Sequence, residues 1–82
     1  MKTYLCEGFT FYNGIVEYKV LKFTNSRLEN LALLQRDTCC PYVVARDVIP
    51  KNDGTFTWAW GHYFTYLENA QADFEERKEK LL

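Results

Sequence analysis

Residues 42–60 read YVVARDVIPKNDGTFTWAW and contain two runs of β-forming residues around a cluster of turn formers. The first run, residues 42–49, is rich in valine and isoleucine, and the second, residues 55–60, alternates threonine or alanine with large aromatic rings. Residues 50–54 hold proline, asparagine, aspartate and glycine, which favour turns. The stretch therefore predicts two strands joined as a hairpin, and Gly61 is expected to end the second strand.

A second hairpin is predicted nearer the start of the chain. Residues 9–23, FTFYNGIVEYKVLKF, are rich in β-branched and aromatic types. At their centre Asn13-Gly14 is a strong signal for a two-residue turn between antiparallel strands. We therefore expect strands at about residues 3–12 and 15–23.

Cap residues and helical spacing predict a helix at residues 26–37. Ser26 and Glu29 have the spacing of a capping box, in which each side chain bonds the other residue's backbone N–H. Four residues then follow one helical face: Leu28, Leu31, Ala32 and Gln35. Leu33 and Leu34 widen the apolar stripe, which predicts burial against a sheet.

A terminal helix is predicted at residues 66–81. Thr65 and Glu68 form a second capping box, and one face carries Leu67, Ala70, Phe74 and Leu81. The other face is charged and holds two pairs at i,i+4 spacing, Asp73 with Arg77 and Glu76 with Lys80. Such pairs stabilise a helix in this orientation.

The predicted element order is ββαββα, in a single α+β domain over residues 1–82. Both helices are expected on one face of a four-stranded antiparallel sheet, because their apolar stripes need a common surface to cover. The order of the strands within the sheet is left open. The second sheet face would then carry the function.

Composition limits the partners and the compartment. The formal net charge is −1, which lacks the basic footprint of a general nucleic-acid binder. No window reaches the roughly 20 apolar residues of a membrane span, and the first residues lack a signal-peptide core. Cys6, Cys39 and Cys40 are an odd number of cysteines, and the two neighbours cannot form an unstrained disulfide. These features predict a cytoplasmic protein with reduced thiols and no membrane association.

Catalytic and metal-binding patterns are weak in this chain. His62 is the only histidine, so a Cys40–His62 dyad and a zinc site that also uses Cys6 are the alternatives to weigh. A single histidine within an aromatic stretch is more often a packed or rim side chain. The cysteines lack C-x-x-C spacing and are expected to be buried structural thiols. We therefore expect no enzyme, no metal and no cofactor.

The aromatic strand suggests a binding surface. Phe56, Trp58 and Trp60 alternate along it and are expected to share one face, either as core, as a stacking platform for bases or as a protein-binding patch. No Lys or Arg lies between Gly54 and Glu68, which argues against nucleic acid and predicts an uncharged patch. The predicted partner-binding residues are Trp58, Trp60, Tyr63, Tyr12 and Tyr18, with His62, Lys51, Asn52 and Asp53 as polar contacts around them.

About half of the chain resembles a group of small proteins. The residues that carry the resemblance are Tyr42-Val43-Val44-Ala45, then Trp60-Gly61-His62-Tyr63-Phe64, and Ala70 followed by Asp73-Phe74. This pattern is similar to the C-terminal stretch of uncharacterised accessory proteins of phages and conjugative elements of gut Firmicutes. The resemblance transfers no catalytic residue and implies a mobile-element context, where small inhibitors of restriction and CRISPR systems occur.

The function expected from the sequence is therefore protein binding. The chain would be a non-enzymatic, mobile-element accessory protein that inhibits a host defence system, of anti-CRISPR or anti-restriction type, by occupying a protein surface. Its partner would be a host or element-encoded protein, and a homodimer is possible. The first alternative is a single-stranded nucleic-acid-binding regulator that uses the aromatic strand, and the second is a small hydrolase or thiol enzyme using Cys40 and His62.

Overall fold

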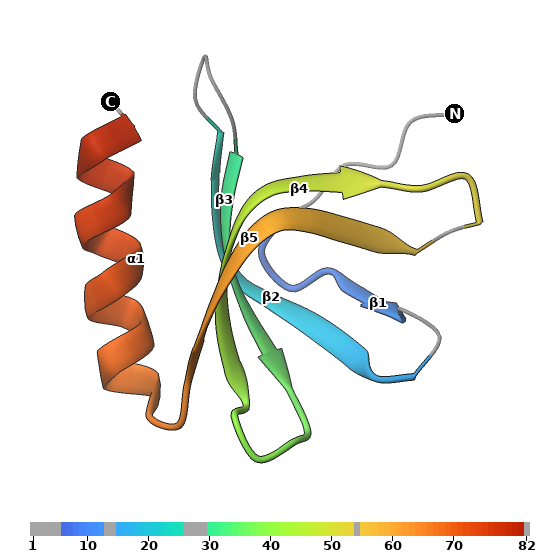
Figure 1. The fold of residues 1–82 in the computed structure, drawn as a ribbon, viewed down its shortest axis with the longest axis horizontal. Coiled ribbons are helices and arrows are strands. Elements are labelled where there is room, and N and C mark those ends of the chain that lie inside the picture. Colours follow the sequence, from blue (N-terminus) through green and yellow to red (C-terminus); the bar gives the residue numbers. More distant parts are fainter. Residues whose placement is uncertain (1–5, 13–14, 26–29, 54, 82) are drawn as a thin grey trace.

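The computed structural model describes residues 6–12, 15–25, 30–53 and 55–81 (Figure 1). Within these residues the elements are, in chain order, β1 (Thr10–Tyr12), β2 (Glu17–Asn25), β3 (Asn30–Arg36), β4 (Tyr42–Pro50), β5 (Phe56–Phe64) and α1 (Leu67–Leu81). The strands form one sheet in the order β1-β2-β3-β4-β5, and each neighbouring pair is antiparallel.

The predicted helix at residues 26–37 is wrong, because residues 30–36 form strand β3 between β2 and β4. Leu31, Ala32, Leu33 and Leu34 are all fully buried, and they alternate between the two faces of the sheet. A strand buried on both faces has a continuous apolar run, which periodicity does not distinguish from a buried helix. The proposed cap residues Ser26 and Glu29 lie outside the described residues.

The fold is therefore a five-stranded antiparallel sheet with one C-terminal helix, in place of the predicted ββαββα order with four strands and two helices. The overall class is still α+β. The pairing of β1 with β2 and of β4 with β5 and the helix α1 agree with the sequence. The Asn13-Gly14 turn lies outside the described residues. Strand β1 is shorter than predicted, because a turn at residues 7–8 precedes it, with Gly8 at a φ of 89°.

The sheet curls and buries side chains on both of its faces. The inner core, on the face away from α1, consists of Phe11, Tyr18, Val20, Ala32, Leu34, Val43, Ala45, Val48 and Phe56. The helix core, on the other face, consists of Leu31, Leu33, Val44, Ala70 and Phe74. Figure 1 shows β1 and β2 curling back toward the far half of the β4–β5 hairpin, with α1 on the opposite side. Ring contacts join the first and last strands: Phe11 and Phe56 have centroids 4.7 Å apart.

Strand β4 changes the direction of its side chains at Asp47. This residue has a φ of 57°, in the left-handed region, which Asp adopts more readily than most residues. Ala45 and Val48 consequently both face the inner core, although three positions separate them. The side chain of Asn30 stabilises the backbone beside Asp47. Its amide nitrogen donates to the carbonyl of Val48 at 2.9 Å, and its amide oxygen accepts from the N–H of Val48 at 2.6 Å.

Strand β5 follows the same change of face. Trp58 pairs with Val48 and packs against the inner core, whereas Trp60 pairs with Arg46 and lies on the α1 side. The expectation that Phe56, Trp58 and Trp60 share one face is therefore wrong.

Gly61 continues β5 and does not end it. A Cβ atom at this position would lie 2.8 Å from Nε1 of Trp58 and 3.2 Å from its Cδ1, so the indole occupies the space of a side chain. A glycine inside a strand often marks such a close approach. The strand therefore runs through to Phe64.

Replacing Asn30 by alanine should lower the free energy of unfolding by about 1–3 kcal/mol, because the N–H and carbonyl of Val48 lose their partner. Urea unfolding of Asn30→Ala measures the loss. The exposed turn variant Asn52→Ala is the control and should change stability by less than about 0.5 kcal/mol. Equal small losses in the two variants would show that Asn30 does not fasten the strand.

Gly61→Ala should also destabilise the protein, by about 1–3 kcal/mol, because the added methyl group overpacks against the Trp58 indole. Thermal unfolding monitored by tryptophan fluorescence reports both stability and the environment of the ring. Ala59→Ser adds one heavy atom at an exposed position of the same strand and should be close to neutral. A neutral Gly61→Ala variant with unchanged fluorescence would contradict this packing.

Candidate functional site

One row of the sheet brings an arginine and a tryptophan together beneath α1. Leu31 of β3 pairs with Arg46 of β4, and Arg46 pairs with Trp60 of β5. Leu31 is fully buried in the helix core, so the row faces α1. Side chains directly opposite one another on a sheet face interact, which brings Arg46 and Trp60 into contact range.

Helix α1 adds two further cations on this side of the sheet, Arg77 and Lys80. Cζ of Arg77 lies 4.0 Å from the ring centroid of Trp60, and Cζ of Arg46 lies 6.0 Å from it. Both distances fall within the range of cation–π attraction, which is strongest for tryptophan. The two arginines also line an open hollow of about 190 Å³, together with Leu31 and Lys80. We refer to Leu31, Arg46, Trp60, Arg77 and Lys80 as the Trp60 site.

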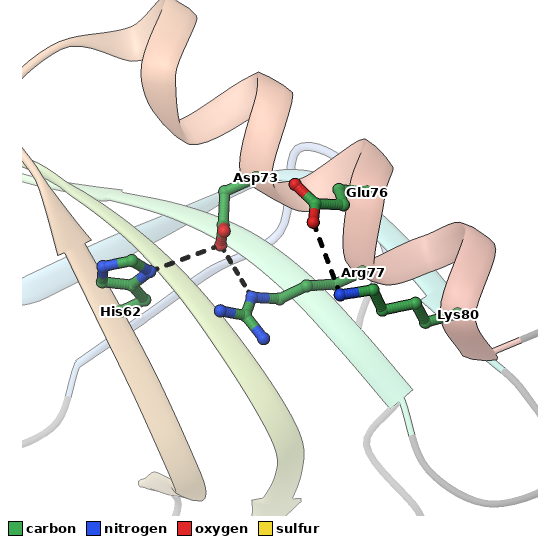
Figure 2. A network of polar contacts seen from close by, with 5 residues as sticks. All are labelled: His62, Asp73, Glu76, Arg77 and Lys80. Carbon is green, nitrogen blue, oxygen red and sulfur yellow. Dashed lines mark hydrogen bonds and ion pairs between the residues drawn. The ribbon is translucent and has the colours of Figure 1, made fainter.

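Carboxylates of α1 contact two cations of the site, Arg77 and Lys80 (Figure 2). Nε of Arg77 donates to Oδ2 of Asp73 at 2.8 Å, and Nδ1 of His62 lies 3.6 Å from the same oxygen. Lys80 and Glu76 form a longer contact of 3.4 Å. The two i,i+4 pairs predicted from the sequence are thus confirmed, and Asp73 also links α1 to β5.

The groups considered for chemistry are spread over the molecule. Cys6 and Cys39 are exposed and Cys40 is half-buried, and all three are free thiols, so the expectation of buried cysteines is wrong for the first two. In the described part of the chain, no three or more His, Cys, Asp or Glu side chains are grouped as a metal site requires. The Trp60 site can hold a ligand by stacking and by charge.

The predicted partner-binding residues do not lie on one continuous surface. Tyr18 is buried, with its ring stacked on Phe11 at 5.3 Å, and Trp58 meets Tyr18 edge to face at 5.3 Å. Trp60 and His62 lie on the opposite face, with ring centroids 5.5 Å apart. These two are the predicted residues that the structure brings together beside α1.

The remaining predicted residues are exposed at separate places. Tyr12 lies on the short strand β1, and Tyr63 lies on β5 with the guanidinium of Arg36 at 4.8 Å from its ring. Lys51, Asn52 and Asp53 form the connection between β4 and β5. Tyr63 pairs with Val43 of the inner core, so it lies on the opposite face of β5 from the Trp60 site.

The cations of the site were not predicted from the sequence. Arg77 and Lys80 have the pattern of a solvated helix face, and Arg46 lies beside Asp47 within a strand rich in valine. The segment around Trp60 lacks Lys and Arg, which predicted an uncharged patch. Only the strand register and the position of α1 bring Arg46 and Arg77 to that ring and Lys80 to the hollow beside them.

The comparisons with known proteins place this chain in no family. No family model matches it, and no curated protein or solved structure matches it either. Within the described residues, no helix has the length and apolar character needed to cross a membrane.

The connection between β4 and β5 gives a pH-dependent prediction. The hydroxyl and the N–H of Thr55 donate to Oδ1 of Asp53 at 2.6 and 3.0 Å, and these bonds hold the pKa of Asp53 below its usual 3.8. A lowered pKa in the folded state means that the interaction is complete above the unfolded value and is lost as pH falls through the folded one. The Thr55 amide resonance should therefore titrate with a midpoint below 3.8. In Asp53→Asn this titration should disappear, and a midpoint at or above the usual value would contradict the contact.

Proposed function

We propose that this protein is a non-enzymatic protein-binding module and that the Trp60 site is the centre of its partner surface. The observation that carries the proposal is a half-buried indole within cation–π range of two arginines that line an open hollow. Tryptophan and arginine are the residue types that most often dominate binding energy at protein interfaces. A surface with both types, already ordered by contacts within the chain, loses little conformational entropy when a partner binds.

The outer edge of β5 supports a protein partner. Among the described strands β5 has one neighbour, β4, and it is nine residues long with no charged residue. Unpaired backbone groups of such an edge can accept an added strand from another protein. Trp60, His62 and Tyr63 all belong to this strand, so a partner bound at the edge would also reach the Trp60 site.

Nucleic-acid binding by the aromatic strand is less well supported. Phe56 is buried, and the ring of Trp58 meets Phe11 at 6.5 Å and Tyr18 at 5.3 Å inside the inner core. A platform that stacks bases needs rings with open faces. These two rings stabilise the fold and do not form such a platform, which favours the protein-binding proposal over its alternative.

The biological role within this proposal is that of a mobile-element accessory that inhibits a host defence system by occupying a protein surface. Support comes from the resemblance carried by residues 42–45 and 60–64, and the three free thiols fit a cytoplasmic site of action. The partner would be a restriction or CRISPR protein of the host, or another protein encoded by the same element. A second copy of this chain is an outcome that sedimentation would detect.

The test is affinity capture from bacteria that express restriction and CRISPR nucleases, followed by titration against the identified partner. Trp60→Ala should weaken binding by at least about 30-fold, the equivalent of 2 kcal/mol for an interface hot spot. Tyr12→Ala is the matched control, because it removes an exposed ring on β1, and it should bind as the unaltered protein does. Circular dichroism of each variant confirms that the fold is retained.

Two results would overturn the proposal. One is full binding by Trp60→Ala together with loss of binding by Tyr12→Ala, which would move the surface to β1. The other is capture that nuclease treatment abolishes, which would favour the nucleic-acid alternative. The anti-defence role is tested separately by phage plating on hosts with and without each defence system. Equal plating on all hosts would reject that role.

A further inference from the structure

The backbone of β5 has one side that pairs with no other described strand. Strand β5 ends the sheet, and in the described part of the chain its paired neighbour is β4. Among the described residues, no backbone hydrogen bond outside this pairing involves residues 57–64. Gly61 has no side chain, so its partial exposure is exposure of the backbone itself, whereas its pair Ala45 on β4 is fully buried. Solvent therefore reaches the outer edge of the strand.

The accessible part of this edge is the second half of β5. At the start of the strand Phe56 is buried, and the rings of Phe9 and Phe11 lie 5.8 and 4.7 Å from its ring, so this half lies beside β1 (Figure 1). Residues 60–64 lie beyond this contact, and all of them pair with β4 without a shift of register. We refer to residues 60–64 as the open edge.

The open edge lacks the features that protect natural edge strands from pairing. Such edges are short, or carry lysine, proline or bulges that prevent another strand from adding. The strand at the other end of the sheet, β1, has only three residues. The open edge reads Trp-Gly-His-Tyr-Phe and contains no Lys, Arg, Asp, Glu or Pro. An extended chain can therefore continue the sheet at this edge.

Both faces of the open edge carry rings, which defines what an added strand would meet. On the inner face, Nε1 of Trp58 and the hydroxyl of Tyr63 lie 2.8 and 3.3 Å from the position that a Cβ of Gly61 would take. The α1 face has a row of three rings: Trp60, His62 and Phe64. Rings on a sheet face pair favourably with β-branched and aromatic side chains of a neighbouring strand. The open edge therefore fits a segment that has uncharged, β-forming residues at successive positions.

The size of the open edge favours a segment of the partner over a second copy of this chain. Two copies paired only through it would share a strip about 17 Å long and about 10 Å wide. This strip is far smaller than the roughly 800 Å² that each protein contributes to a stable interface. A different protein can add contacts at the Trp60 site, because Trp60 belongs to both the open edge and that site.

We propose that the open edge of β5 binds an extended, uncharged segment of the partner protein as an added strand, an inference that rests on the proposed function and specifies the form of its ligand. Backbone hydrogen bonds hold the segment along residues 60–64. Its alternate side chains contact Tyr63 on one face and His62 on the other. Because the segment is uncharged, its binding depends little on the salt concentration.

Hydrogen exchange detected by NMR tests the inference on the unaltered protein. The probe is an acetylated and amidated Val-Thr-Val-Thr-Val peptide. At saturation, the amides of residues 60–64 that do not bond β4 should exchange at least about tenfold more slowly, the effect of one added hydrogen bond. The control is the same peptide methylated on every backbone nitrogen, which keeps the side chains and removes the donors. It should give no protection.

Two variants locate the binding on β5. Tyr63→Thr removes one ring of the open edge and should weaken peptide binding by about twofold to fivefold, the contribution of one aromatic cross-strand pair. Ile49→Thr is the matched control, because Ile49 is 47% exposed and Tyr63 is 45% exposed, but β4 has a neighbour on each side. Its peptide affinity should be unchanged. The methylated peptide tests the inference even if Tyr63→Thr fails to fold.

Three outcomes would overturn the inference: no slowing of exchange in residues 60–64, equal protection by the methylated peptide, or equal weakening by Ile49→Thr. A protein that sediments as a dimer, with these amides protected before peptide is added, would also overturn it, because a second copy would then occupy the edge.

A failure of this inference is distinct from a failure of the proposed function. If the peptide does not bind while Trp60→Ala still loses the partner, the surface is correct and recognition by an added strand is wrong. If the peptide protects residues 60–64 while Trp60→Ala keeps the partner, the edge accepts a strand and the Trp60 site is not the centre of the partner surface.

Discussion

The left-handed backbone of Asp47, held by the double hydrogen bond between Asn30 and Val48, is the constraint on which the rest of the structure depends. Side chains alternate strictly along a strand, so one residue out of phase moves every later side chain to the other face. Strand β4 thereby contributes Ala45 and Val48 to the same inner core. Its neighbour β5 follows, which separates Trp58 from Trp60. Trp60 lies beside Arg77 of α1 because of this separation.

The same bend explains how a short chain covers an aromatic-rich sheet with a single helix. Alternation along flat strands would leave the rings of Phe11, Tyr18 and Phe56 on an open surface. The bent sheet instead brings β1 opposite the first half of β5, where Phe11 and Phe56 meet at 4.7 Å. Apolar burial on this scale offsets the strain of a non-glycine residue at positive φ, which is of order 1–3 kcal/mol. The sheet therefore covers one of its own faces and leaves the other to α1.

Local signals in the sequence were enough for the two hairpins and α1. The turn formers of residues 50–54 and the i,i+4 pairs of α1 depend on neighbours in the chain, so they could be predicted. Strand β3 could not be predicted in this way. Its Leu-Ala-Leu-Leu run fits a buried helix as well as a strand, unless it is known that both faces of the sheet are buried. The Trp60 site could not be predicted from the sequence either, because its residues also come together through non-local contacts. Arg46 meets Trp60 through strand register, and Arg77 meets it through helix packing, and neither is a local property.

The two tryptophans belong to parts of the fold that depend on different elements. Trp58 packs with the inner core, which contains no residue of α1, whereas the Trp60 site needs α1 to supply Arg77 and Lys80. In the described part of α1 the buried residues are Ala70 and Phe74, and the helix also contacts the sheet through Asp73 with His62, Glu75 with Lys22 and Arg77 with Trp60. Elements with few buried contacts open at lower free energy than the core. Loss of α1 docking would therefore remove the Trp60 site while the curled sheet still holds its inner core, so this site is the part of the molecule that responds first to destabilisation.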